Sequence, residues 1–166
     1  IGMKSGWGIA GAATLFLTLF GEREYAVGGR PDLGVMLMYL ARAVGTGIGP
    51  LIGRWLIDEH DVDGLRRLTV AAFLWSAGWY GVFSVVTTVW LAVPSLVLAH
   101  FGGSILWVQS SVLLQRIVPE RFRGRVISTD IGRATLSISA STWIYGRLAD
   151  VPGADLRRLL QVMTVS

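Results

Sequence analysis

The sequence predicts an all-α protein, a polytopic transmembrane helical bundle, and three observations support this prediction. The 166 residues are 52% hydrophobic and only 16% charged, whereas roughly a quarter of the residues in a soluble domain are charged. Residues 68–90 contain no charged side chain, and this stretch is long enough to cross a ~30 Å hydrocarbon core as a helix. Comparable apolar stretches flank it, and the charged residues collect in the short gaps between them.

Taken in order along the chain, five membrane spans and the start of a sixth are expected. Each is close to the ~20 residues that a membrane helix needs. Strands of a membrane barrel would be about half as long, with alternating polarity, and this pattern is absent from the sequence. The predicted spans cover residues 2–20, 33–56, 68–90, 94–118 and 126–145, with another from residue 156.

The gaps between the spans read as short polar connections. The segment LAVP is interpreted as a tight turn that places Pro94 at a first helical position. PERFRGR is interpreted as a loop. The chain has no initiator Met at its start and ends inside an apolar segment, so we expect a partial C-terminal half of a longer protein.

The basic residues define an expected orientation. The net charge of +4 comes from residues between apolar spans, which favours membrane topology over nucleic-acid binding. The two loops on one side carry more Lys and Arg than the loops opposite, so we place that side in the cytoplasm of a cell (inner) membrane protein. The residues that dominate this bias are Arg121, Arg123 and Arg125 in the PERFRGR loop.

The second span carries a face of small residues and one cation. Gly45, Gly49 and Gly53 lie four residues apart, a spacing that lets a neighbouring helix approach closely, and the fifth span or a missing half is the expected partner. Arg42 and Thr46 share this face. Two interpretations of Arg42 remain open: a residue of a transport pathway, or a side chain that extends to the membrane interface.

The fourth and fifth spans each carry a polar stripe, which usually faces a bundle interior or a cavity. The fifth-span stripe consists of Asp130, Ala134, Ser137, Ser141 and Tyr145, with Arg133 on its edge. Asp130 and Arg133 are spaced to pair with each other. Alternatively, both anchor the helix at the headgroups. The fourth-span stripe includes His100 and Gln115, and a structural role for His100 is the alternative to a functional one.

No catalytic pattern emerges, and we expect neither an enzyme nor a cofactor. The chain has no Cys and two His, and neither His has partners at metal-ligand spacing. The acidic residues near residue 60 form one solvated loop. The third span carries no charge and is expected to face lipid.

Three segments resemble the major facilitator superfamily of secondary transporters, specifically its C-terminal six-helix half in bacterial exporter-like members. They are LARAVGTGIGPLIGR, LLQRIVPERFRGRVIS and YGRLAD. The charged loop motif of the family survives only loosely, as Gly53, Asp58, Gly64, Arg66 and Arg67.

The resemblance implies a secondary active transmembrane transporter that exports a small molecule by alternating access, in exchange for protons. It implies a missing N-terminal transporter half as partner, beside the lipid bilayer and the small-molecule substrate, with no role for nucleic acid. A non-transporting membrane scaffold or sensor on the same fold is the alternative. An intramembrane enzyme is a third class, for which the residues offer no support.

Overall fold

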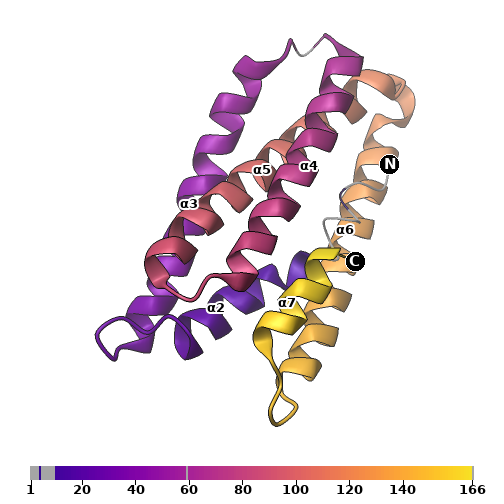
Figure 1. Ribbon diagram of the computed structural model, residues 1–166. Coiled ribbons are helices and arrows are strands. Elements are labelled where there is room, and N and C mark those ends of the chain that lie inside the picture. Colours follow the sequence, from indigo (N-terminus) through magenta and orange to yellow (C-terminus); the bar gives the residue numbers. More distant parts are fainter. Residues whose placement is uncertain (1–3, 5–9, 59, 166) are drawn as a thin grey trace.

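The computed structural model describes residue 4, residues 10–58 and residues 60–165, and helices make up almost all of this part (Figure 1). The described part contains no β-strand, only an isolated bridge between Val27 and Arg30. The predicted all-α fold class is confirmed. The elements are a 3₁₀ turn η1 (Ala10–Ala12), then α2 (Ala13–Arg23), α3 (Pro31–Leu56), α4 (Val62–Val85), α5 (Val89–Ile117), α6 (Glu120–Ala149) and α7 (Leu156–Val165).

Three of the described helices, α3, α4 and α5, are long and apolar enough to cross a membrane. Helix α6 spans 30 residues but is not among them, since Asp130, Arg133 and many hydroxyl side chains interrupt its apolar positions. Most of the predicted first span, residues 2–20, precedes α2, and its residues 2–3 and 5–9 lie outside the described part.

Large apolar side chains on the outside of the bundle agree with a lipid environment. Trp55, Trp90 and Trp143 are 79%, 78% and 70% exposed, and Leu74 and Leu136 are 64% and 71% exposed. Trp55 lies in the last turn of α3 and Trp90 in the first turn of α5, positions typical of the membrane interface, where Trp is enriched. Large contiguous apolar surfaces are rare on soluble monomers, and this exposure is consistent with a membrane protein.

Helix α5 lies between α3 and α4 and packs along both (Figure 1). Its buried residues lie on all sides, including Ala99, Ser104 and Leu106. Helices α2 and α7 close one end of this three-helix unit through a core that contains Phe16, Phe20, Phe83, Leu96 and Leu160. Helix α6 packs mainly against η1.

The connections alternate between the two ends of the bundle (Figure 1). The α3–α4 and α5–α6 connections lie at one end, and the α2–α3, α4–α5 and α6–α7 connections lie at the other. Gly28 and Gly29 have φ of 59° and 73° in the α2–α3 turn, a conformation that glycine adopts readily. This alternation agrees with the predicted order of the connections; which end faces the cytoplasm stays a prediction.

Two predicted boundaries are wrong. The break between the third and fourth spans falls at residues 86–88, and Pro94 lies inside α5. The five consecutive β-branched residues from Val85 to Val89 explain this position, because such side chains lower helix propensity. The predicted span 68–90 is therefore divided between α4 and α5.

The predicted PERFRGR loop is helical. Only Val118 and Pro119 separate α5 from α6, and Arg121, Arg123 and Arg125 lie in the first turns of α6. Pro119 ends the preceding helix, and Glu120 in the first turn places a negative charge at the positive end of the helix dipole. The start of α6, which carries the three arginines, lies at the end of the bundle that also holds the α3–α4 connection (Figure 1).

Candidate functional site

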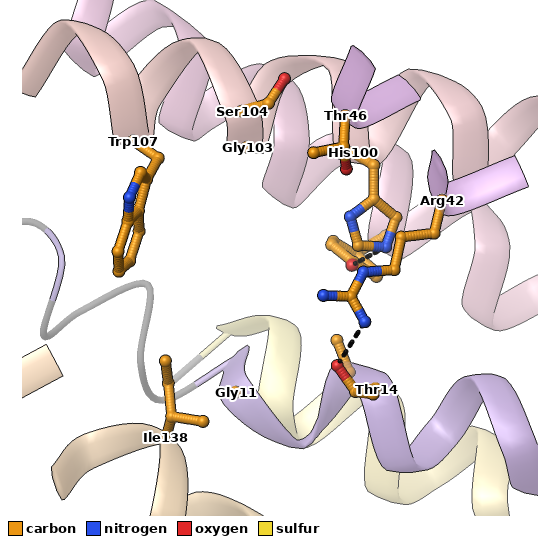
Figure 2. Close-up of a pocket in the computed structure, with 11 residues that line it drawn as sticks. Gly11, Thr14, Arg42, Thr46, His100, Gly103, Ser104, Trp107 and Ile138 are labelled. Carbon is orange, nitrogen blue, oxygen red and sulfur yellow. Dashed lines mark hydrogen bonds between the residues drawn. The ribbon is translucent and has the colours of Figure 1, made fainter. Parts of the chain in front are cut away.

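A cavity of about 330 Å³ lies where α3, α4 and α5 meet η1, α2 and α6. Its volume falls at the lower end of the range for small-molecule sites. Arg42, His100 and Trp107 point into it in Figure 2. The lining residues are Gly11, Ala13, Thr14, Arg42, Thr46, Tyr80, His100, Gly103, Ser104, Trp107 and Ile138.

Arg42 supplies the positive charge of the cavity. It lies near the middle of α3, roughly 16 Å along the axis from Pro31 at ~1.5 Å per residue. The half-buried guanidinium donates a hydrogen bond from Nη1 to Thr14 Oγ1 at 3.1 Å (Figure 2). Within the described part of the chain, no carboxylate pairs with Arg42, and the lining contains no Asp or Glu.

His100 and Tyr80 form the wall beside Arg42. The Tyr80 hydroxyl and His100 Nε2 share a hydrogen bond of 3.0 Å, and the two rings meet edge to face at a centroid distance of 5.7 Å. Both side chains are buried. This contact holds the imidazole against α4 and leaves the space in front of the guanidinium open.

The opposite end of the cavity is apolar. The Trp107 side chain extends from α5 into this end, toward Ile138 of α6 and Gly11 (Figure 2). Trp107 follows His100 by two helical turns, roughly 10 Å along α5. The cavity thus has a cationic and hydroxyl-bearing end and an aromatic end.

The glycine face of α3 contacts α5, the fourth predicted span, and not the fifth span that was one of its two expected partners. A Cβ atom at Gly49 would lie 2.6 Å from the Phe101 carbonyl oxygen, and one at Gly45 would lie 3.0 Å from His100 Cβ. At Gly53 the nearest atoms are 3.2 Å away, on Ile105. This close approach places His100 of α5 next to Arg42 of α3.

The remaining predicted pathway residues do not line the cavity. Asp130 is buried on α6 and pairs with Lys4, whose Nζ lies 3.1 Å from Asp130 Oδ2. Arg133 is exposed, so the expected Asp130–Arg133 pair is wrong: Lys4 from the start of the chain takes that place. Gln115 is exposed and Ser137 is half-buried. Of the predicted set, the structure brings together Arg42, Thr46 and His100.

The third predicted span, largely α4, does more than face lipid. Its buried side chains include Thr69, Ser76 and Tyr80, and Ser76 Oγ donates to the Ala99 carbonyl of α5 at 2.6 Å. The absence of charge suggested a lipid-facing helix. Ser76 follows Thr69 by seven residues and Tyr80 follows Ser76 by four, so all three lie on one face of the helix. This polar stripe is the signal that would have identified Tyr80.

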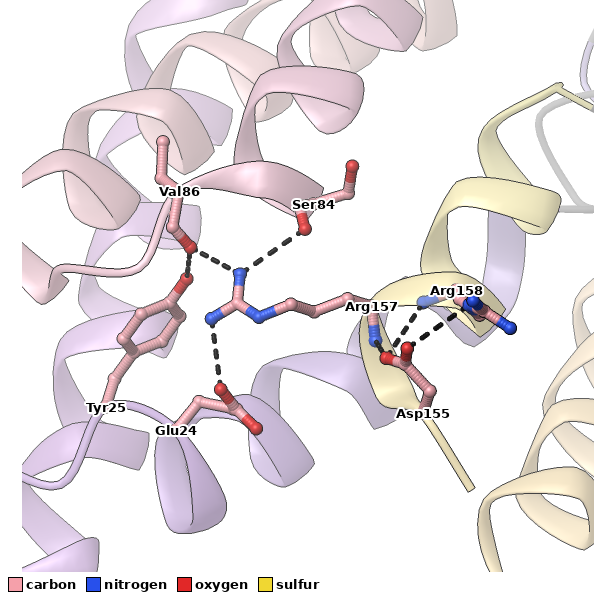
Figure 3. A network of polar contacts seen from close by, with 7 residues as sticks. All are labelled: Glu24, Tyr25, Ser84, Val86, Asp155, Arg157 and Arg158. Atoms are coloured by element: carbon pink, nitrogen blue, oxygen red, sulfur yellow. Dashed lines mark hydrogen bonds and ion pairs between the residues drawn. The ribbon is translucent and has the colours of Figure 1, made fainter. Parts of the chain in front are cut away.

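A second polar network closes the end of the bundle formed by α2, α4 and α7 (Figure 3). The Arg157 guanidinium donates to the carbonyl oxygens of Ser84 and Val86 and pairs with Glu24 at 3.0 Å. Tyr25 donates its hydroxyl to Val86 at 2.7 Å. Burial raises the pKa of the Tyr25 phenol against the opposing effect of Arg157, so the hydroxyl keeps its proton.

The acidic connection before α4 has a structural role. Asp61 accepts a hydrogen bond of 2.8 Å from the Gly64 N–H and caps the helix. No group of three potential metal-binding residues occurs in the described part of the chain.

Comparisons of the chain with protein-family models, curated proteins and solved structures find no match.

Proposed function

We propose that this chain is part of a secondary active transporter that carries a small molecule across the membrane, by export through alternating access. The observation that carries the proposal is Arg42, a cation near the middle of a candidate membrane helix that faces a cavity. A charged side chain at the bilayer centre costs ~2.5–3.5 kcal/mol on insertion scales, so such residues mark substrate or ion pathways.

Two further features support transport. The cavity lies at the meeting point of the three candidate membrane helices, and transporter sites lie near the membrane midplane between helices. The LARAVGTGIGPLIGR segment, which carries Arg42 and the glycine face, is also one of the segments that resemble the major facilitator superfamily. Protons as the coupling ion and a second transporter half as partner belong to the same proposal.

Substrate flux in proteoliposomes that contain this chain together with the proposed second half tests this function. We expect Arg42→Ala to abolish most flux, while Arg54→Ala, a change on the same helix but outside the cavity, leaves it near the wild-type value. Folded yield is measured for both variants. Equal flux in both at equal yield would contradict the proposal.

A further inference from the structure

We infer that the cavity binds a small organic anion whose acid group meets Arg42 and whose flat apolar body lies against Trp107. This assignment rests on the proposed function in that it names the class of molecule carried. It comes from the distribution of charge, hydroxyl groups and aromatic surface within the cavity.

The charge of the cavity is positive and is not neutralised within the described residues. Arg42 hydrogen-bonds to the neutral Thr14 hydroxyl. The nearby cation Lys4 lies 5.1 Å from the centre of the Trp107 ring, but Asp130 pairs with it. The one uncompensated charge among the lining residues is therefore the guanidinium, whose donors match a carboxylate or another planar acid group.

Two hydroxyl-bearing residues occur at the same end as the guanidinium. Thr46 and Thr14 flank Arg42 in the cavity wall, whereas Ser104 lies between the two ends and donates its hydroxyl to the Phe101 carbonyl (Figure 2). Hydroxyl groups donate to acid oxygens that the guanidinium leaves free. A cation at this end would meet Arg42 at close range without a compensating carboxylate, so the cavity selects against it.

The length and the far end of the cavity define the rest of the ligand. Trp107 and Ile138 offer a ring face and an aliphatic side chain at the end opposite Arg42 (Figure 2). The distance of roughly 10 Å between the turns that carry His100 and Trp107 fits an acid group joined to a fused bicyclic ring. A molecule of that size also fits a cavity of about 330 Å³.

Three isosteric probes test the assignment by equilibrium binding to the purified protein in detergent. They are 2-naphthoate, neutral 2-naphthalenemethanol and cationic 2-naphthylmethylammonium. We expect the anion to bind at least tenfold more tightly than either analogue. Equal binding of the three, or tighter binding of the cation, would overturn the assignment without any variant having to fold.

Variants then locate the two ends. Arg42→Met is expected to remove the preference for the anion, while Arg54→Met, an exposed arginine on the same helix, retains it. Trp107→Leu is expected to reduce naphthoate affinity at least fivefold with little effect on butyrate, whereas Trp107→Phe retains most of the affinity. An anion preference that survives in folded Arg42→Met would overturn the assignment.

Flux separates this inference from the transport function. Selective, Arg42-dependent binding of naphthoate without any flux would support the ligand class and count against transport. Arg42-dependent flux of a cation, with no binding of naphthoate, would support transport and overturn the ligand class.

Discussion

Lys4 and Asp130 form a buried ion pair, with Nζ and Oδ2 3.1 Å apart and side chains only 3% and 4% exposed. Lys4 also donates to Ser111 Oγ at 2.8 Å and lies over the Trp107 ring. One ammonium group therefore joins the start of the chain to α5 and α6 beside the aromatic end of the cavity.

Removing one member of this pair should destabilise the protein strongly. A lone charge left in a buried site costs ~3–5 kcal/mol, so we expect Asp130→Asn and Lys4→Met each to lower the free energy of unfolding by about that amount. The double variant should lose less than the sum of the two. Chemical unfolding in detergent measures this, and additive losses would show that the two side chains do not interact.

The glycine face of α3 provides a matched pair of substitutions on one helix. Gly49→Ala would press a methyl group against Phe101 and Ser104 of α5, and overpacking of this kind costs ~1–3 kcal/mol. Gly47→Ala meets open space and should be neutral or stabilising by up to ~1 kcal/mol, because Ala favours a helix more than Gly. Thermal unfolding of both variants checks the contrast, and equal melting temperatures would contradict the packing.

Arg157 should contribute more to stability than its neighbour Arg158. Arg157 bonds to α2 and α4, whereas the Arg158 side chain is 84% exposed and pairs only with Asp155 among the described residues. Hydrogen bonds to charged groups contribute ~1.5–3 kcal/mol, so we expect Arg157→Met to lose about 2 kcal/mol and Arg158→Met almost nothing. Unfolding curves decide this, and a similar small loss in both variants would remove Arg157 as a structural link.

The predicted orientation can be measured by cysteine labelling, since the chain has no native Cys. We expect Cys at Glu120 or His60 to be protected from a membrane-impermeant maleimide in intact cells, and Cys at Val151 to react. Labelling of all three sites in lysed cells is the control. Reaction of the Cys at Glu120 in intact cells would show that the orientation is the opposite of the predicted one.

Periodicity predicted which faces of the helices are buried, but not what covers them. The repeat of Gly45, Gly49 and Gly53 identified a packing face, and the stripe from Asp130 to Tyr145 is largely buried on α6. The spacing of residues fixes a face but contains no information on the helix opposite. The contact of the glycine face with α5 and the pair between Asp130 and Lys4 join residues that are far apart in the sequence. Only the folded structure identifies these partners.

The candidate site was predictable where charge interrupts apolar sequence, and less so elsewhere. Arg42 and His100 stand out in their spans for this reason. Tyr80 did not, because a tyrosine in an uncharged span resembles its apolar neighbours until the polar stripe with Thr69 and Ser76 is recognised. Pro94 misplaced a boundary, because a proline that is tolerated inside a helix resembles one that starts a helix.

The position of α5 between α3 and α4 also determines the order in which the protein can assemble during synthesis. The glycine face of α3 and the buried hydroxyl groups of α4 are both covered by α5, which is made after them. Until α5 has been made, the two earlier helices lack the surface that each of them packs against. The newly made chain therefore passes through a stage in which both faces are uncovered, and a truncation before α5 leaves two helices that lack their common partner.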